Sequence, residues 1–101
     1  MVLLKARKDS YRNKRPFGED ALLVVEVSDT TFTYDRNIKV PRYAAAGVPE
    51  VWIENLPDNT LLVFRDPSGN SYRTCLTLKR KDSVSVQAFP DVIFKVGELL
   101  G

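Results

Sequence analysis

Short apolar runs recur along the chain, most of them rich in β-branched side chains and separated by polar turns. The strongest run, Ala21–Ser28, is apolar on both faces, which predicts a central strand covered on both sides. Turn sequences at Pro57–Asn59 and Pro67–Asn70 separate later runs. The remaining predicted strands, of which we expect the last to close the sheet, are Val2–Ala6, Pro49–Glu54, Thr60–Arg65, Ser71–Leu78, Ser83–Ala88 and Asp91–Phe94.

One helix is predicted, over Tyr34–Ala46. Its successive alanines favour a helix, Asp35 suits its cap or first turn, and Gly47 suits the position just after its end. Pro41 falls inside this helix, so we expect a kink there or a free carbonyl at Asn37. Two strands, a helix and then a run of strands predict an α/β domain of the mixed α+β type, with a mixed, mostly antiparallel sheet.

Length and composition indicate one globular domain over residues 1–101. Apolar residues make up 44% and charged residues 28%, close to the average for soluble domains, so disorder and fibrous folds are excluded. The longest apolar run, Ala21–Val25, is too short for a membrane helix, and the first twenty residues hold no signal sequence. A single cysteine, Cys75, allows no internal disulfide, which favours the cytoplasm.

The charged and titratable residues limit the possible chemistry. The absence of histidine excludes His-based triads and His-ligated zinc. The net charge is only +2, but the first twenty residues carry six basic side chains against three acidic ones. This basic segment, with a loop over residues 7–20, predicts either a phosphate-bearing partner or a solvated loop. Its basic residues are Lys5, Arg7, Lys8, Arg12, Lys14 and Arg15.

Glu26 is the unusual residue of the strongest strand. Alternation places it on one face with Leu22, Val24 and Ser28. A carboxylate in such a strand is costly to desolvate unless it meets a cation. That cation could be a metal ion, Lys39 or a surface arginine. The alternative to a functional role for Glu26 is a structural ion pair or an exposed strand end.

The predicted helix brings three polar residues onto one face. Asp35 and Lys39 are four residues apart and could simply pair with each other. Lys39 and Tyr43 share this face, which the short connection from the preceding strand allows to pack over Glu26. The other large aromatic side chains, together with Tyr43, are expected in the core rather than on a binding surface, and the thiol is interpreted as structural. The aromatic residues are Trp52, Phe64 and Tyr72, and the thiol is that of Cys75.

Several stretches together resemble a known family. The chain is similar to bacterial restriction-endonuclease-like proteins, a branch of the PD-(D/E)XK nuclease superfamily. The resemblance extends over nearly the whole chain, and its central part is quite specific. The matching stretches are LLVVEVSD (Leu22–Asp29), YDRNIK (Tyr34–Lys39), AGVPEVWIE (Ala46–Glu54), VFRDPSGNSY (Val63–Tyr72) and FPDVIFKVGELL (Phe89–Leu100).

The resemblance implies a restriction-endonuclease-like core and Mg²⁺-dependent hydrolysis of DNA phosphodiesters. Glu26 would be the metal ligand on the second strand of the motif, with the backbone carbonyl of Val27 as a further ligand. Lys39 would be the catalytic lysine, displaced onto the helix because serine stands where the strand motif has its lysine. The supporting residues would be Ser28, Asp35 and Tyr43.

One departure from the family pattern concerns the first metal-binding aspartate. Alignment places it before Met1, and the first acidic residue is Asp9. The chain is therefore expected to be the C-terminal part of a family member, lacking the usual N-terminal part. A single carboxylate gathers little charge against the dehydration of Mg²⁺, so we expect a weak site and slight or absent nuclease activity.

Two other interpretations stay open at this stage. The first is a non-catalytic remnant that binds nucleic acid or forms a homo-oligomer through apolar sheet surface left exposed. The second is a small β-rich scaffold in which Glu26 and Lys39 form a buried ion pair.

Overall fold

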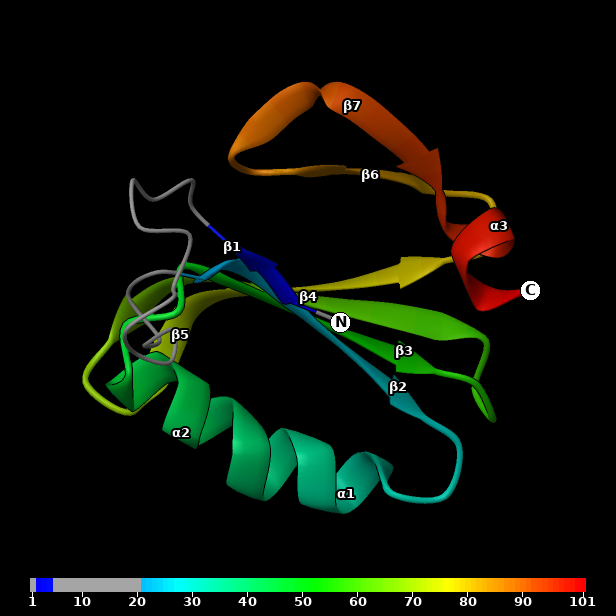
Figure 1. Cartoon of the computed structure of the whole chain (residues 1–101). Coiled ribbons are helices and arrows are strands. Elements are labelled where there is room, and N and C mark those ends of the chain that lie inside the picture. Colours follow the sequence, from blue (N-terminus) through cyan, green and yellow to red (C-terminus); the bar gives the residue numbers. More distant parts are fainter. Residues whose placement is uncertain (1, 5–20) are drawn as a thin grey trace.

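The computed structural model describes residues 2–4 and 21–101 (Figure 1). The predicted helix is observed as three consecutive segments, an α-helical turn, a π-helical stretch and a second α-helical part, and a short helix follows the last strand. In chain order the elements are β1 (Val2–Leu4), β2 (Ala21–Ser28), α1 (Phe32–Tyr34), η2 (Asp35–Lys39), α2 (Val40–Ala45), β3 (Glu50–Asn55), β4 (Thr60–Ser68), β5 (Ser71–Lys79), β6 (Ser83–Val86), β7 (Phe89–Lys95) and α3 (Val96–Leu100).

Within the described part of the chain, the main sheet has five strands in the order β1-β2-β3-β4-β5. Only β2 and β3 run parallel, and the helical segments α1, η2 and α2 make the crossover between them. The other neighbouring pairs are antiparallel, each following the chain through a shorter connection. The predicted mixed, mostly antiparallel sheet with one main helix is therefore confirmed, although β3 rather than β2 is the middle strand.

A second sheet covers the opposite face from the main helix. Strands β6 and β7 pair with each other as an antiparallel hairpin above the main sheet, and α3 follows at its end (Figure 1). The prediction that Asp91–Phe94 closes the main sheet is wrong. The alternating residues Val84 and Val86 of β6 point down into an apolar cluster, so the hairpin packs on the face of the sheet instead of extending its edge.

The main sheet therefore has a core on each face. The helix-side core packs the helix against the sheet, and the hairpin-side core packs the hairpin and α3 against it. The buried residues of the helix-side core are Ala21, Val24, Val40, Val48, Val51, Ile53, Leu62 and Phe64. Those of the hairpin-side core are Leu23, Val25, Trp52, Leu61, Val63, Val84, Val86 and Val96.

The main helix differs from its prediction in two ways. It begins at Phe32, after the N-cap residue Thr31, so Asp35 is not a cap but a buried residue of the π-helical stretch. This stretch ends directly before the turn that carries Pro41, where the missing N–H and the proline ring disturb α-helical bonding. The expected irregularity is thus a π-helical stretch. Gly47 adopts φ +80° just past the end of the helix, as predicted.

Two residues lie elsewhere than the strand pattern predicts. The pairing of β1 with β2 shifts register so that Leu4 lies opposite Ala21, and Leu22 is left out of the ladder. Leu22 accordingly lines a pocket with hairpin residues instead of sharing the face of Glu26. Cys75 is exposed on β5 and not part of the core. Within the described residues, no helix has the length and apolar character needed to cross a membrane.

Candidate functional site

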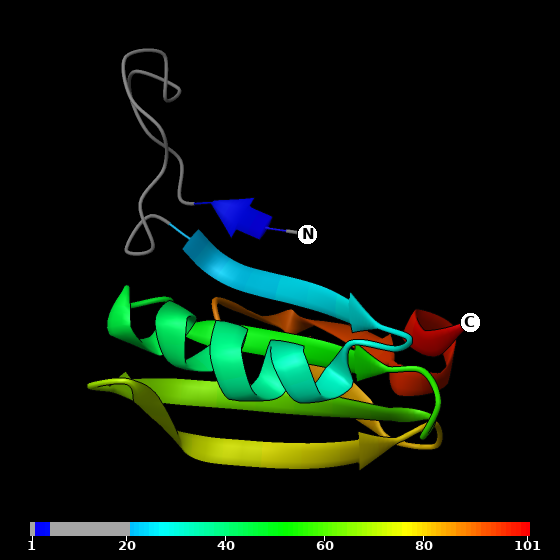
Figure 2. The same cartoon turned by 90° about the horizontal axis from the view of Figure 1, so that it is seen from below.

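A polar cluster lies where β2 ends beneath the main helix. The alternation of β2 points Glu26 and Ser28 toward the helix, while the helix presents Asp35, Lys39 and Tyr43 to the strand. We call these five residues the helix-side polar cluster. The view of the molecule from the helix side shows the helix running along the sheet in front of β3, with β2 alongside it (Figure 2). The predicted packing of the helix over Glu26 is confirmed.

Both carboxylate oxygens of Glu26 have partners. The hydroxyl of Tyr43 donates a hydrogen bond to Oε1, and the Lys39 ammonium lies 3.3 Å from Oε2. The side chains of Lys39 and Glu26 are 36% and 19% exposed. The ion pair is therefore open to solvent along one side and within reach of a ligand.

Asp35 forms the inner part of the cluster, with a side chain only 3% exposed. The hydroxyls of Ser28 and Thr31 donate to its Oδ2 over 2.5 Å and 2.9 Å, and Lys39 Nζ lies 3.4 Å from its Oδ1. Burial alone would raise the pKa of Asp35, but these hydrogen bonds and the ammonium outweigh it and lower the pKa. Asp35 is thus held as an anion. The sequence reasoning missed Thr31, although a hydroxyl four residues before an aspartate in a helix is a recognisable signal.

The electrostatics of the cluster keep Lys39 charged and Tyr43 neutral. The nearby Glu26 carboxylate, and secondarily Asp35, raise the pKa of Lys39. Burial and the hydrogen bond to Glu26 raise the pKa of Tyr43 well above its usual value. Tyr43 therefore acts as a hydrogen-bond donor near neutral pH, and Lys39 is a cation shared by two carboxylates.

The described residues supply only part of a metal site. Glu26 offers hard oxygen donors beside solvent, which suits Mg²⁺, but Asp35 is buried and fully hydrogen-bonded. No group of three or more potential metal ligands is present among residues 2–4 and 21–101. The side chain of Val27 points to the other face and is exposed.

The basic segment near the start of the sequence falls outside the described residues. The predicted phosphate-binding residues Lys5, Arg7, Lys8, Arg12, Lys14 and Arg15 therefore remain a prediction, as does the loop over residues 7–20. Two other cations lie exposed on the same helix as Lys39, namely Arg36 and Arg42.

A second polar network on the hairpin side was not predicted. Glu50 of β3 is fully buried and accepts hydrogen bonds from Trp52 Nε1 and Arg65 Nε, both over 2.8 Å. Its Oε1 accepts from the backbone N–H of Gln87 over 2.7 Å, and Arg65 also donates to the Ser85 carbonyl. The network ties the β6–β7 turn to the main sheet. The sequence feature that could have indicated this network is Glu50, an acidic residue two positions before Trp52 and therefore on the same face of the strand.

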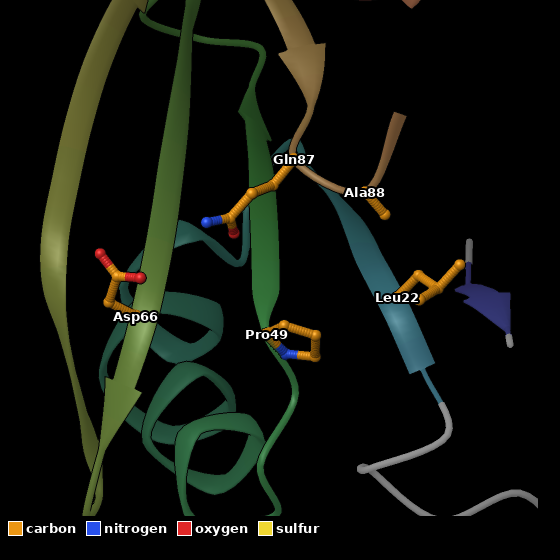
Figure 3. A pocket seen from close by; sticks show the side chains of 5 residues that line it. All are labelled: Leu22, Pro49, Asp66, Gln87 and Ala88. Carbon is orange, nitrogen blue, oxygen red and sulfur yellow. The ribbon is translucent and has the colours of Figure 1, made fainter. Parts of the chain in front are cut away.

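A pocket of about 250 Å³ adjoins this network (Figure 3). It lies where the β6–β7 turn meets the strands of the main sheet, on the side away from the main helix. Among the described residues that line it, Asp66 is the only ionisable one, and Asp66 is already bonded to Thr74. The pocket therefore lacks a set of convergent polar groups, and the helix-side polar cluster is the better candidate site. The pocket is lined by Leu22, Pro49, Asp66, Gln87 and Ala88.

Comparison with known protein families gives a match over nearly the whole chain. The profile of a protein family described as "Uma2: Putative restriction endonuclease" matches residues 1–97. Neither a curated protein nor a solved structure matches the chain.

Proposed function

The chain belongs to the Uma2 family of restriction-endonuclease-like proteins, and we propose that its helix-side polar cluster is part of a Mg²⁺-dependent DNA phosphodiesterase site. The observation that carries the proposal is the meeting of Glu26 with Lys39 beside solvent. A carboxylate and an ammonium at 3.3 Å offer a cation and an oxygen donor to one phosphodiester. Family membership supplies the reaction class.

Each member of the cluster has a role in this proposal. Glu26 would hold the metal ion, with the Val27 backbone carbonyl as a further ligand. Lys39 would face the phosphate and offset the charge that develops on it. Tyr43 fixes one oxygen of Glu26 through its hydrogen bond. Asp35, held by Ser28, keeps the Lys39 ammonium beside Glu26.

Magnesium, when bound, would polarise the phosphodiester and lower the pKa of a coordinated water. The helix-side polar cluster offers it one carboxylate that is open to solvent, that of Glu26. Further carboxylate oxygens would have to come from outside this cluster or from a second copy. We therefore propose weak metal binding and slight hydrolytic activity for this chain alone.

The exposed cations on the helix support a polyanionic ligand. Arg36 and Arg42 lie on the same helix as Lys39 and are exposed, so both add positive charge that attracts a polyanion to this side of the molecule. Binding to a DNA duplex should then weaken steeply as salt rises. A domain that binds DNA in this manner without cleaving it is the second candidate function, favoured by the basic segment of the sequence.

Thermal melts in the presence and absence of Mg²⁺ or Mn²⁺ test the metal proposal. A ligand at about ten times its Kd stabilises by about 1.4 kcal/mol, which for a domain of this size is a rise in Tm of about 6–10 °C. We expect such a rise for the wild type and none for Glu26→Ala. Glu98→Ala, which removes an exposed glutamate on α3, should respond like the wild type.

A plasmid-nicking assay with Mn²⁺ then tests the reaction. Nicking by the wild type should be lost in both Glu26→Ala and Lys39→Ala. The absence of any metal response in the wild type refutes the metal site. A metal response without nicking, combined with salt-dependent DNA binding, would favour the non-cleaving candidate. If Glu26→Ala only unfolds the protein, Glu26→Gln tests the same site with its shape retained.

A further inference from the structure

The outer strand of the hairpin presents an apolar edge to solvent. All seven residues of β7 are exposed, and Ile93 is 68% exposed. Phe89, Val92 and Phe94 of the same strand are also exposed large apolar side chains. Among the described residues, β7 pairs with β6 alone, so its other edge is open. Soluble proteins ordinarily protect or cover such an edge, because it is a template for another strand.

We propose that a second copy of this chain covers this edge by antiparallel pairing of β7 with β7 about a twofold axis at Ile93. In this register Asp91 lies opposite the partner's Lys95, and Val92 lies opposite the partner's Phe94. The contact repeats on both sides of the axis, as an isologous interface requires. The two hairpins would then form one four-stranded sheet.

Charge complementarity within β7 selects a second copy as the occupant. Asp91 and Lys95 are exposed, and neither is in an ion pair with another described residue. They are equally spaced about Ile93 and opposite in charge, so the twofold pairing brings each beside its complement twice. Opposite charges that face each other across strands stabilise the pairing, and like charges weaken it.

The ends of the strand fix the proposed register. Pro90 has no N–H to donate to a neighbouring strand, and α3 begins at Val96, so the pairing is limited to residues 91–95. If the twofold axis moved one residue toward Pro90, the proline would lie opposite the partner's Phe94. If the axis moved one residue toward α3, Asp91 would lie opposite helical residues of the partner. The register of β7 with β6 also shifts between Ser85 and Val86, so residues 90–92 have no partner on β6.

This interface is independent of the proposed nuclease function. The helix-side polar cluster lies beneath the main sheet, whereas the hairpin lies above it (Figure 1). A dimer formed through β7 therefore leaves Glu26 and Lys39 open to a ligand. Loss of the dimer should leave the response to Mg²⁺ or Mn²⁺ unchanged.

Sedimentation velocity over a series of protein concentrations tests the pairing. The wild type should approach twice the 11.4 kDa mass of the chain. Asp91→Lys and Lys95→Asp should each raise the dissociation constant at least about tenfold, because each sets like charges opposite each other twice. The double variant with both substitutions restores the complementarity and should return to within about threefold of the wild type. Ile93→Lys should abolish the dimer by placing two ammonium groups at the axis.

The control is Leu76→Lys, which changes another exposed apolar residue, on β5, and should leave the mass unchanged. Circular dichroism verifies that each variant is folded. A wild type that stays monomeric at every concentration overturns the proposal. A dimer that is insensitive to the single charge reversals, or that the double variant fails to restore, overturns the proposed register.

Discussion

The Glu50 network should contribute a large share of the stability of this domain. In Glu50→Gln, an amide replaces a fully buried carboxylate that accepts three hydrogen bonds. The amide has one acceptor oxygen, so its NH₂ group must face either the Gln87 N–H or the two donors from Trp52 and Arg65. At least one donor loses its acceptor, and Arg65 loses its counter-charge.

The magnitude follows from these losses. A hydrogen bond to a charged group contributes about 1.5–3 kcal/mol, and breaking a buried ion pair costs about 3–5 kcal/mol. Arg65 is partly exposed, so water compensates some of the loss at its guanidinium. We therefore expect a fall of about 2–4 kcal/mol in the free energy of unfolding, or about 10–25 °C in Tm.

Urea unfolding followed by tryptophan fluorescence measures this change. Trp52 is the only tryptophan and donates directly to Glu50, so its emission reports on the network itself. Hydrogen exchange of the β6 amides should quicken more than that of β4, because the network holds the β6–β7 turn. Glu98→Gln removes the charge of an exposed glutamate and should stay within about 0.5 kcal/mol of the wild type. A loss below about 1 kcal/mol for Glu50→Gln would refute the reasoning.

Three further predictions concern groups on other parts of the fold. Because the pKa of Asp35 is lowered from its ordinary value of 3.8, its ionisation stabilises the folded protein at pH values above 3.8. Thermal melts at decreasing pH should show that the wild type loses this stability below about pH 4, whereas the Tm of Asp35→Asn should depend less on pH. Burial raises the pKa of Glu54 above 4.5, so its ionisation opposes folding. Glu54→Gln should therefore raise the Tm at pH 7 but not at pH 4, and equal rises at both pH values would contradict this. Gly47→Ala should cost about 1 kcal/mol in urea unfolding because of the φ of +80°, whereas no loss would mean that the helix end relaxes.

The strands and the helix were largely predictable from the sequence because their signals are local. Alternation, turn residues and successive alanines depend on neighbours a few positions away, and they located β2 to β5 and the main helix. The arrangement of the hairpin was not predictable from them. Whether a strand joins a sheet edge or packs on its face depends on contacts between residues distant in sequence, such as the hydrogen bond that joins Glu50 to Gln87 across thirty-seven positions.

The helix-side polar cluster was predictable in part. The four-residue spacing of Asp35, Lys39 and Tyr43 and the outlying carboxylate of Glu26 identified its members, and the structure brings them together. The buried, hydroxyl-bonded state of Asp35 was not foreseen, because it depends on two hydroxyls from outside the predicted helix, those of Ser28 and Thr31. Their roles in hydrolysis rest on the family and stay a prediction.

The two cores on opposite faces of the main sheet imply an order of assembly during synthesis. The buried residues of the helix-side core all precede β5, whereas the hairpin-side core also needs Val84, Val86 and Val96. A nascent chain on the ribosome can therefore bury one face of the sheet while Trp52 and its neighbours are still uncovered. Until translation reaches α3, the growing polypeptide exposes an apolar surface that a chaperone could cover. A pause in elongation before α3 would prolong the exposure of this surface.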